Sequence, residues 1–291
     1  MPDFPDDFVA DMRSTRAWPE LVDTLWRSPT LMRLTYGRLW ELVAEVLPPA
    51  PARIVEVGAG TGSVALELAR AGHDVAAVEP DDTAIELARR ALDRVGDGPG
   101  RLTYHQAEIE SWEPDTADFD AIVTARVLHH VVDPAEVLAR LRGWLRPGGR
   151  LIVVDFFYDH FDRRSALWLA QARSLLEAAS QFHAHHDDPL PVDPDEAVRR
   201  LEAEWRREHE DEEMLNKAAA ILDPLHDHFQ VDELSWHPYL YWELLLGLQV
   251  DDPAVEREVG RRYADWERQL LDVGALPGLI ARIVAHPPTH A

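Results

Sequence analysis

The chain contains no cysteine, so disulfide bonds, thiolate nucleophiles and thiolate metal sites are excluded. It also lacks an uncharged apolar run long enough to cross a bilayer, and its first residues show no basic region followed by an apolar core. We therefore expect neither a membrane span nor a signal peptide, and a cytoplasmic protein.

Basic residues are scarce, because 29 Lys and Arg stand against 53 Asp and Glu, which gives a formal charge of −24. Such an excess of acid repels phosphate backbones and anionic lipid surfaces. We expect no nucleic-acid partner and no membrane docking. The length of 291 residues is ample for a large buried core.

A glycine-rich stretch organises the rest of the chain. The apolar run 54–57 meets Gly58, Gly60 and Gly62, and residues 64–69 then repeat apolar side chains at helical spacing. The order is strand, tight turn and helix, with free N–H groups at the helix N-terminus. The spacing G-x-G-x-G differs from the dinucleotide fingerprint G-x-G-x-x-G, which argues against an oxidoreductase on a nicotinamide-binding fold.

Further strands alternate with helices after this turn. Residues 73–80 are predicted to form a second strand ending in an acid, about twenty residues past the glycines, where an α/β nucleotide-binding fold places a carboxylate against the ribose hydroxyls. Other strands are predicted over 102–106, 119–124 and 151–155, with a helix over 134–144. The alternation predicts a parallel sheet with helices on both faces.

Motifs in register over residues 54–155 carry a family resemblance: VEVGAGTG, VEPDD, QAEIE, FDAIVTARVLHHVVDP and LRPGGRLIVVD. On them the chain resembles the class I S-adenosylmethionine-dependent methyltransferases, and looks closest to the small-molecule methyltransferases of ubiquinone and menaquinone biosynthesis. The resemblance implies a Rossmann-like, doubly wound α/β sheet of seven strands in the order 3-2-1-4-5-7-6, with strand 7 antiparallel. It implies an enzyme that uses S-adenosyl-L-methionine as its cofactor.

The resemblance assigns the glycine turn to the methionine and ribose portions of this cofactor. Gly58, Ala59, Gly60 and Gly62 would let the backbone approach the ligand. Glu56 takes the place of the acid that holds the methionyl ammonium, usually through water.

Residues further along would complete the cofactor site. Glu79, followed by Pro80, should accept hydrogen bonds from both ribose hydroxyls. Glu108 replaces the family's usual aspartate and should accept from the adenine amino group, with Ile109 against the ring. Arg126 is placed to meet the methionyl carboxylate or the acceptor, and a surface ion pair is the alternative.

His129 and His130 follow the fourth strand, where this fold lines its active cleft. A neutral imidazole can take the proton from a hydroxyl or phenol acceptor as the methyl group arrives, so both are candidate catalytic residues. The alternative is that one or both cap the following helix or pack beneath it.

We treat the chain as one methyltransferase domain, in which residues 51–155 form the cofactor-binding core. Residues 1–50 are predicted to be a helical lid that brings Arg33 and Tyr36 towards the cofactor, with core packing as the alternative for Tyr36.

The C-terminal half is predicted to begin with a helical cap, residues 156–232, that shapes the acceptor pocket. Its amphipathic helices are expected over 167–182, 195–213 and 215–225. Residues 233–291 should supply strands 6 and 7 around a helix that begins at Pro253. The run 239–245 fits either a strand or a helix.

Two further groups of side chains invite a functional interpretation. Aromatic and histidine residues that could wall an acceptor pocket, or merely pack, are Tyr158, His160, His209, Trp236, Tyr239 and Trp242. Residues 183–188 contain His and Asp, but without a recognised metal-ligand spacing, so we interpret them as a solvated loop and expect no bound metal.

The expected reaction is methyl transfer to an oxygen or nitrogen of a small-molecule metabolite. The alternative is a protein that binds the cofactor but performs non-methylating chemistry or a regulatory role. An anionic acceptor would need a local arginine such as Arg126 or Arg163, so we favour a neutral or amine-bearing acceptor. A homodimer is compatible with the sequence, which does not fix the oligomeric state.

Overall fold

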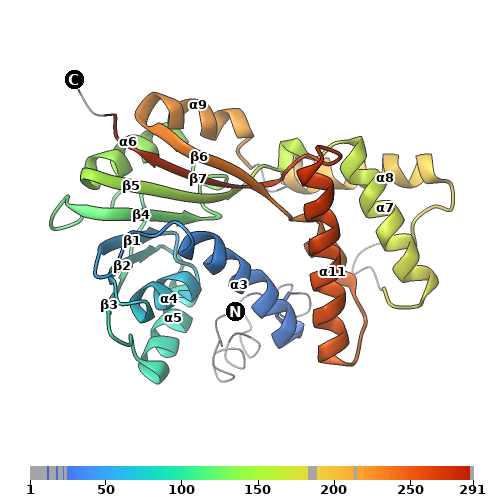
Figure 1. Cartoon of the computed structure of the whole chain (residues 1–291), viewed down its shortest axis with the longest axis horizontal. Coiled ribbons are helices and arrows are strands. Elements are labelled where there is room, and N and C mark those ends of the chain that lie inside the picture. Colours follow the sequence, from blue (N-terminus) through green and yellow to red (C-terminus); the bar gives the residue numbers. More distant parts are fainter. Residues whose placement is uncertain are drawn as a thin grey trace.

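The computed structural model describes residues 25–182, 189–212 and 215–288, together with Met12, Trp18 and Val22. A seven-stranded sheet occupies one side of the molecule and a group of helices extends beyond its edge (Figure 1). The strands are β1 (Arg53–Val57), β2 (Asp74–Glu79), β3 (Arg101–Gln106), β4 (Phe119–Ala125), β5 (Leu145–Phe156), β6 (Gln230–His237) and β7 (Ile280–His286).

The strand order is β3-β2-β1-β4-β5-β7-β6, and β7 pairs antiparallel with both β5 and β6. All other neighbouring strands are parallel. This confirms the expected order and the antiparallel seventh strand. The order along the sheet reverses between β1 and β4, and open α/β sheets bind their ligands beyond the carboxyl ends of strands at such a point.

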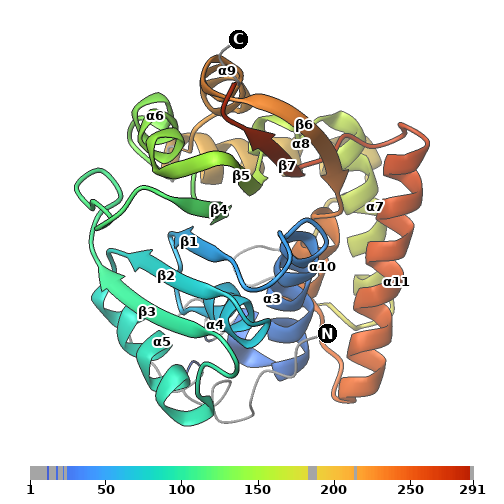
Figure 2. The ribbon, with the colours of Figure 1, turned by 60° about the vertical axis from the view of Figure 1, so that its left-hand side comes forward.

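Helices cover both faces of the sheet (Figure 2). One face carries α3 (Pro29–Ala44), α4 (Ser63–Arg70) and α5 (Asp82–Val95), and the other carries α6 (Pro134–Trp144) and α9 (Ala218–His228). Successive residues of the central strands alternate between the two layers: Ile54 packs in the core with α4, whereas Val55 packs in the core with α6 and α9. Since both faces are buried, these strands are apolar almost throughout.

The remaining helices form what we call the helical lobe: α7 (Arg163–Ala178), α8 (Pro194–Arg206), α10 (Leu240–Gly247) and α11 (Pro253–Asp272). A π-helical turn, η3 (Arg207–Glu212), extends α8. Asp193 caps α8 with Pro194 in its first turn, as expected. Helix α7 begins at Arg163, four residues before the predicted start, because Asp162 accepts hydrogen bonds from the N–H groups of Arg164 and Ser165.

The lobe is not the contiguous cap predicted over 156–232. Helix α9 lies within residues 156–232 but packs beside α6 on the sheet. Helices α10 and α11 follow residue 232 in the chain, yet they pack against α7 in the lobe. The ambiguous run 239–245 lies in α10, because the Glu267 carboxylate of α11 accepts hydrogen bonds from the N–H groups of Tyr239, Leu240 and Tyr241, at 2.7–2.9 Å. A partner almost thirty residues away therefore fixes the start of this helix.

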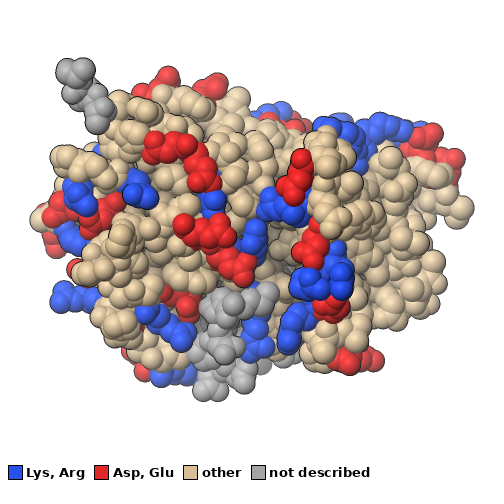
Figure 3. Space-filling view, in the orientation of Figure 1, with Lys and Arg blue, Asp and Glu red and all other residues tan. Residues whose placement is uncertain are grey.

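Two properties of the whole molecule follow from the described residues. No helix among them is long and apolar enough to cross a bilayer. On the face shown in Figure 3, acidic and basic side chains are interspersed, with no continuous basic stretch.

Candidate active site

A cavity of about 560 Å³ opens at the carboxyl ends of β1, β2 and β4. It is the position that the strand order predicts for a ligand. Of the predicted cofactor and catalytic residues, its lining contains Glu56, Gly58, Ala59, Gly60, Glu79, Pro80, Glu108, Ile109, Arg126 and His130. Gly62 and His129 are the two that lie behind the lining, among the residues that the structure describes.

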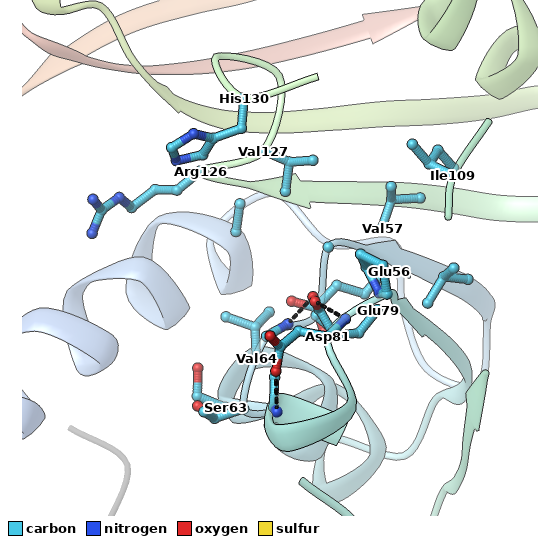
Figure 4. Close-up of a pocket in the computed structure, with 18 of the residues that line it drawn as sticks. Glu56, Val57, Ser63, Val64, Glu79, Asp81, Ile109, Arg126, Val127 and His130 are labelled. Atoms are coloured by element: carbon cyan, nitrogen blue, oxygen red, sulfur yellow. Dashed lines mark hydrogen bonds between the residues drawn. The ribbon is translucent and has the colours of Figure 1, made fainter. Parts of the chain in front are cut away.

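Hydrogen bonds hold the turn after β1 against the end of β2. The N–H groups of Gly58 and Ala59 donate to the carbonyl oxygen of Val78, at 2.8 and 3.0 Å. The carboxylate of Glu79 accepts the N–H of Gly60 at 2.7 Å and, through its other oxygen, that of Asp81 at 3.0 Å (Figure 4). Each carboxylate oxygen has a second lone pair, so Glu79 can still accept from a ligand hydroxyl while its orientation is fixed.

The three glycines of the turn have different surroundings, and all three have positive φ. A Cβ on Gly58 would stand 2.4 Å from Val127, and one on Gly62 would stand 2.2 Å from the Tyr104 hydroxyl. A Cβ on Gly60 would meet no atom within 4 Å, because it would project into the open cavity. Gly60 therefore allows close approach of a ligand, whereas Gly62, contrary to expectation, is required by packing beneath the turn.

Glu56 is buried, with 2 % of its surface exposed, and one of its carboxylate oxygens has no hydrogen-bond partner among the described residues. Burial, opposed by the N–H of Ala65 and reinforced by the charge of Glu79, raises the pKa of Glu56 well above its usual value. A buried acceptor left without a donor is costly. A cationic group in the cavity would supply that donor, which suits a methionyl ammonium.

Arg126 enters the cavity from the loop after β4. Its φ of 63° lies in the left-handed region, and its N–H donates to the carbonyl oxygen of Val154 at 2.7 Å. Its guanidinium lies over the ring of Trp242, 4.3 Å from the centroid. It extends away from Glu79, on the side of the cavity where His130 lies (Figure 4). The Arg126 side chain therefore marks the end of the cavity opposite the predicted ribose position.

The two adjacent histidines face different environments. His129 is 1 % exposed and its Nδ1 bonds the buried carboxylate of Asp155, which also accepts the N–H groups of Leu128 and Phe156. His130 is exposed and lines the cavity, with its ring centroid 4.1 Å from that of His129. Desolvation by the cavity walls, and then the charges of His129 and Arg126, lower the pKa of His130 to about 4.

Asn216, which the sequence reading missed, fixes the loop that carries these groups. Its side-chain amide donates to the carbonyl oxygens of Leu128 and Val131 at 3.1 and 2.7 Å, and its N–H donates to that of His129 at 2.8 Å. Asn216 lies more than eighty residues from the loop, so no local pattern signals this contact. Asp155, by contrast, ends a predicted strand on the cleft side.

The outer walls come from the N-terminal segment, in which a lid over the cofactor was expected. Trp18, Trp26, Tyr36 and Leu39 line the cavity, and the Trp26 indole N–H donates to the Tyr36 hydroxyl at 3.0 Å. Arg33, predicted to reach the cofactor with Tyr36, is outside the lining in the described part of the chain.

The predicted acceptor-wall residues pack behind the cavity instead. No described residue of 156–232 lines it, and the predicted set is largely in aromatic contact within the lobe and at the sheet edge: Tyr158, His160, His209, Trp236, Tyr239 and Trp242. The predicted cap thus supports the cavity from behind. Residues 183–188 lie outside the described residues, and the described ones contain no group of three metal-ligating side chains.

The residues of the cavity fit S-adenosylmethionine. Gly60 leaves open space at the turn, and the buried Glu56 oxygen lacks a donor, which a cationic group would supply. The N-cap residue of α4 is Gly62, which provides no side-chain cap, and Ser63 and Val64 of the first turn line the cavity. Together with the strand order, these features define a class I S-adenosylmethionine-dependent methyltransferase.

Comparison with known proteins agrees with this class. Residues 32–217, more than half of the chain, match the family described as "Methyltransferase domain", and the chain belongs to that family. It is 31% identical over 167 residues to an uncharacterized methyltransferase of Mycobacterium bovis, which covers 57% of this chain and 81% of that protein. It is 29% identical over 173 residues to a ubiquinone biosynthesis O-methyltransferase of Methylocella silvestris, covering 60% and 62%.

Among solved structures, the fold is similar to that of a geranyl diphosphate C-methyltransferase from Streptomyces coelicolor, crystallised with S-adenosyl-L-homocysteine. The TM-score is 0.53 at 14% identity, over 89% of this chain and 81% of that one. The chain is thus an S-adenosylmethionine-dependent methyltransferase, and the proteins similar to it in sequence include one named as an O-methyltransferase and one named as a C-methyltransferase.

Proposed function

We propose that the enzyme transfers a methyl group to an oxygen or nitrogen of a small-molecule acceptor, with His130 as the general base. The observation that carries this proposal is the single cavity that runs from Glu79 to His130 and Arg126. The bound cofactor supplies a methyl group on a positively charged sulfur, and the departing sulfur keeps the electron pair of the broken bond as the acceptor forms the new one.

The roles of the cofactor-binding residues follow from their positions. Glu79 accepts the ribose hydroxyls, Glu56 pairs with the methionyl ammonium, and the first turn of α4 receives the methionyl carboxylate. Ile109, which is 7 % exposed, packs against the adenine, and Glu108 accepts from its amino group.

The acceptor's proton leaves through His130. Because the pKa of His130 is lowered to about 4, its imidazole is neutral at physiological pH and can accept a proton from an O–H or N–H group. His129 is a positioning residue: Asp155 fixes its ring, and that ring packs against His130. A neutral base beside the cavity supports transfer to an acidic heteroatom.

The reaction is tested by incubating the protein with methyl-labelled S-adenosylmethionine and metabolite extracts, and following the label by mass. Labelled small molecules with an O- or N-methyl group are expected. A label found only on carbon would overturn the choice of atom. Binding of S-adenosylmethionine without release of S-adenosylhomocysteine or any labelled product, at saturating extract, would instead favour the non-methylating alternative.

The cofactor roles are tested by calorimetry with S-adenosylhomocysteine. Glu79→Ala should weaken binding by about 1.5–3 kcal/mol, the range for hydrogen bonds to a charged group. Glu86→Gln, an exposed carboxyl on α5 paired with Arg90, is the matched control and should bind as the wild type does. Unchanged affinity in Glu79→Ala would contradict the assignment of the ribose.

A further inference from the structure

A buried, charged hydrogen-bond donor stands at the acceptor end of the cavity. Nε of Arg126, a residue of the cavity lining, has no acceptor among the described residues. The guanidinium lies over the ring of Trp242 and forms no ion pair with a described carboxylate, although the chain is strongly acidic. Leaving a buried donor unsatisfied costs free energy, and the cost is larger for a charged one. The Arg126 guanidinium therefore indicates a missing acceptor in the cavity.

The structure holds the Arg126 guanidinium in place. The left-handed φ of Arg126 is an uncommon conformation for a long side chain, and the hydrogen bond from its N–H to Val154 fixes it at the end of β4. Trp242 lies in the first turn of α10, whose N-terminal N–H groups are capped by the buried Glu267. Because Trp242 supports the guanidinium from one side, Arg126 needs little rearrangement to bind a ligand, which favours affinity.

The cofactor already has partners for its own charged groups in the proposed function. Its ammonium is assigned to Glu56 and its carboxylate to the first turn of α4, which leaves Arg126 uncommitted. A bound S-adenosylmethionine also adds a sulfonium to the cavity that contains the guanidinium. Two positive charges in one partly enclosed cavity repel each other, and an anion beside them lowers the energy of both.

We propose that Arg126, held over the ring of Trp242, binds a carboxylate group carried by the acceptor. A guanidinium offers two parallel N–H groups that match the two oxygens of a carboxylate. This inference rests on the proposed function and names the chemical class of its substrate. It replaces the expectation of a neutral or amine-bearing acceptor, because the required arginine lines the cavity. The other candidate, Arg163, is exposed and paired with Asp195 on the surface of the lobe.

The probe is a matched pair of small ligands, benzoate and its neutral isostere benzamide, titrated by calorimetry into the complex of the protein with S-adenosylhomocysteine. Benzoate should bind at least about tenfold more tightly than benzamide, as expected for a charge-assisted hydrogen bond. Equal binding of the two ligands, or binding of neither, would overturn the inference.

Variants separate the acceptor from the cofactor. Arg126→Gln should abolish the preference for benzoate, and Arg126→Lys should retain part of it. Trp242→Leu, which removes the ring beneath the guanidinium, should reduce it. Arg163→Gln is the matched control and should keep it in full. All four should bind S-adenosylhomocysteine with wild-type affinity, and their thermal midpoints check that they are folded.

Two other results have distinct meanings. If Arg126→Gln loses affinity for S-adenosylhomocysteine but not for 5′-methylthioadenosine, which lacks the amino-acid portion, Arg126 holds the methionyl carboxylate and the inference is wrong. If the wild-type protein binds neither nucleoside, the proposed function itself fails.

Discussion

Each glycine of the turn after β1 has a different neighbour, and the consequences of replacing them should differ accordingly. Gly60 borders open cavity, whereas Gly62 lies against Tyr104 and Ala88, where an added Cβ would stand 2.2 and 2.8 Å from existing atoms. The same residue type therefore serves ligand approach at one position and core packing two residues later.

We predict that Gly60→Val abolishes binding of S-adenosylhomocysteine, because the side chain would fill the space that the ligand needs. The variant should stay folded but lose some stability, since a β-branched residue is strained at the positive φ of Gly60. Gly62→Ala should lower stability by about 1–3 kcal/mol for the overpacking, in addition to the same kind of backbone strain, with a smaller effect on affinity. Calorimetry and urea unfolding of both variants measure the two quantities. Tight binding by Gly60→Val would mean that the turn does not face the cofactor.

The pH dependence of His130 provides a second prediction. With a pKa of about 4, His130 is neutral well below pH 6.5, so kcat should hold its plateau there and fall only near pH 4. His130→Gln should lower kcat by about 10²-fold or more, the usual contribution of a general base. His226→Gln, on the exposed surface of α9, is the control. An acid limb near pH 6.5 would exclude this histidine as the base.

At the scale of single residues, the sequence predicted which residues lie in the turn after β1 and the loop after β4, but not which way each side chain points. Of the adjacent His129 and His130, one is buried on Asp155 and the other faces the cavity, and their spacing is the same in either arrangement. Gly60 and Gly62 are equally indistinguishable, because the atoms opposite Gly62 belong to β3 and α5. Such distinctions depend on contacts between segments far apart in the chain.

At the scale of elements, α10 depends on a neighbouring helix for its start. It has only eight residues, most of them apolar, and the carboxylate of Glu267 from α11 accepts hydrogen bonds from N–H groups at its N-terminus. Burial, opposed by these hydrogen bonds, raises the pKa of Glu267 to about 7. Because Trp242 of α10 supports Arg126, a buried carboxyl group on α11 is linked through α10 to a residue of the cavity lining.

The raised pKa of Glu267 makes the stability of the folded protein depend on pH. The unfolded chain releases the Glu267 proton near pH 4.5 and the folded chain near pH 7. The stabilisation that the protonated Glu267 gives to the folded state is therefore fully present below pH 4.5 and is lost as the pH rises through 7. Relative to Glu267→Gln, the wild-type free energy of unfolding should fall by about 3 kcal/mol over this range. Urea unfolding at several pH values measures it, with Glu86→Gln as the control. A constant difference between wild type and Glu267→Gln would contradict the assignment.

Elements with local signals were predictable, and elements fixed by distant partners were not. Asp193 and Pro194 give the start of α8, and the apolar runs give all the central strands. The run 239–245 stayed ambiguous because its cap, Glu267, lies in another helix. Residues 156–232 do not form one contiguous cap, because the apolar face of α9 packs on the sheet beside α6. The sequence shows that this face is apolar but not which surface it covers.

At the scale of the whole molecule, the lobe and the sheet share one core. Trp168 of α7 and Trp205 of α8 belong to the same buried cluster as Ile54 of β1 and Val123 of β4. Removing the lobe would expose the apolar face of this cluster, so trimming it should unfold the protein rather than spare the cofactor site. Helices α10 and α11 reinforce the connection, since they pack against α7 and α3.

This shared core predicts a single cooperative unfolding transition for the whole chain. Tryptophan fluorescence, to which Trp168 and Trp205 of the lobe contribute together with tryptophans beside the sheet such as Trp144, should give the same urea midpoint as far-UV circular dichroism, which reports on all elements. S-adenosylhomocysteine should shift both curves together, by about 2.7 kcal/mol at a concentration one hundred times its Kd, because only the native state binds it. Two separated transitions, with only the later one moved by the ligand, would mean that the lobe is an independent domain and that its contacts behind Arg126 are not part of the folded core.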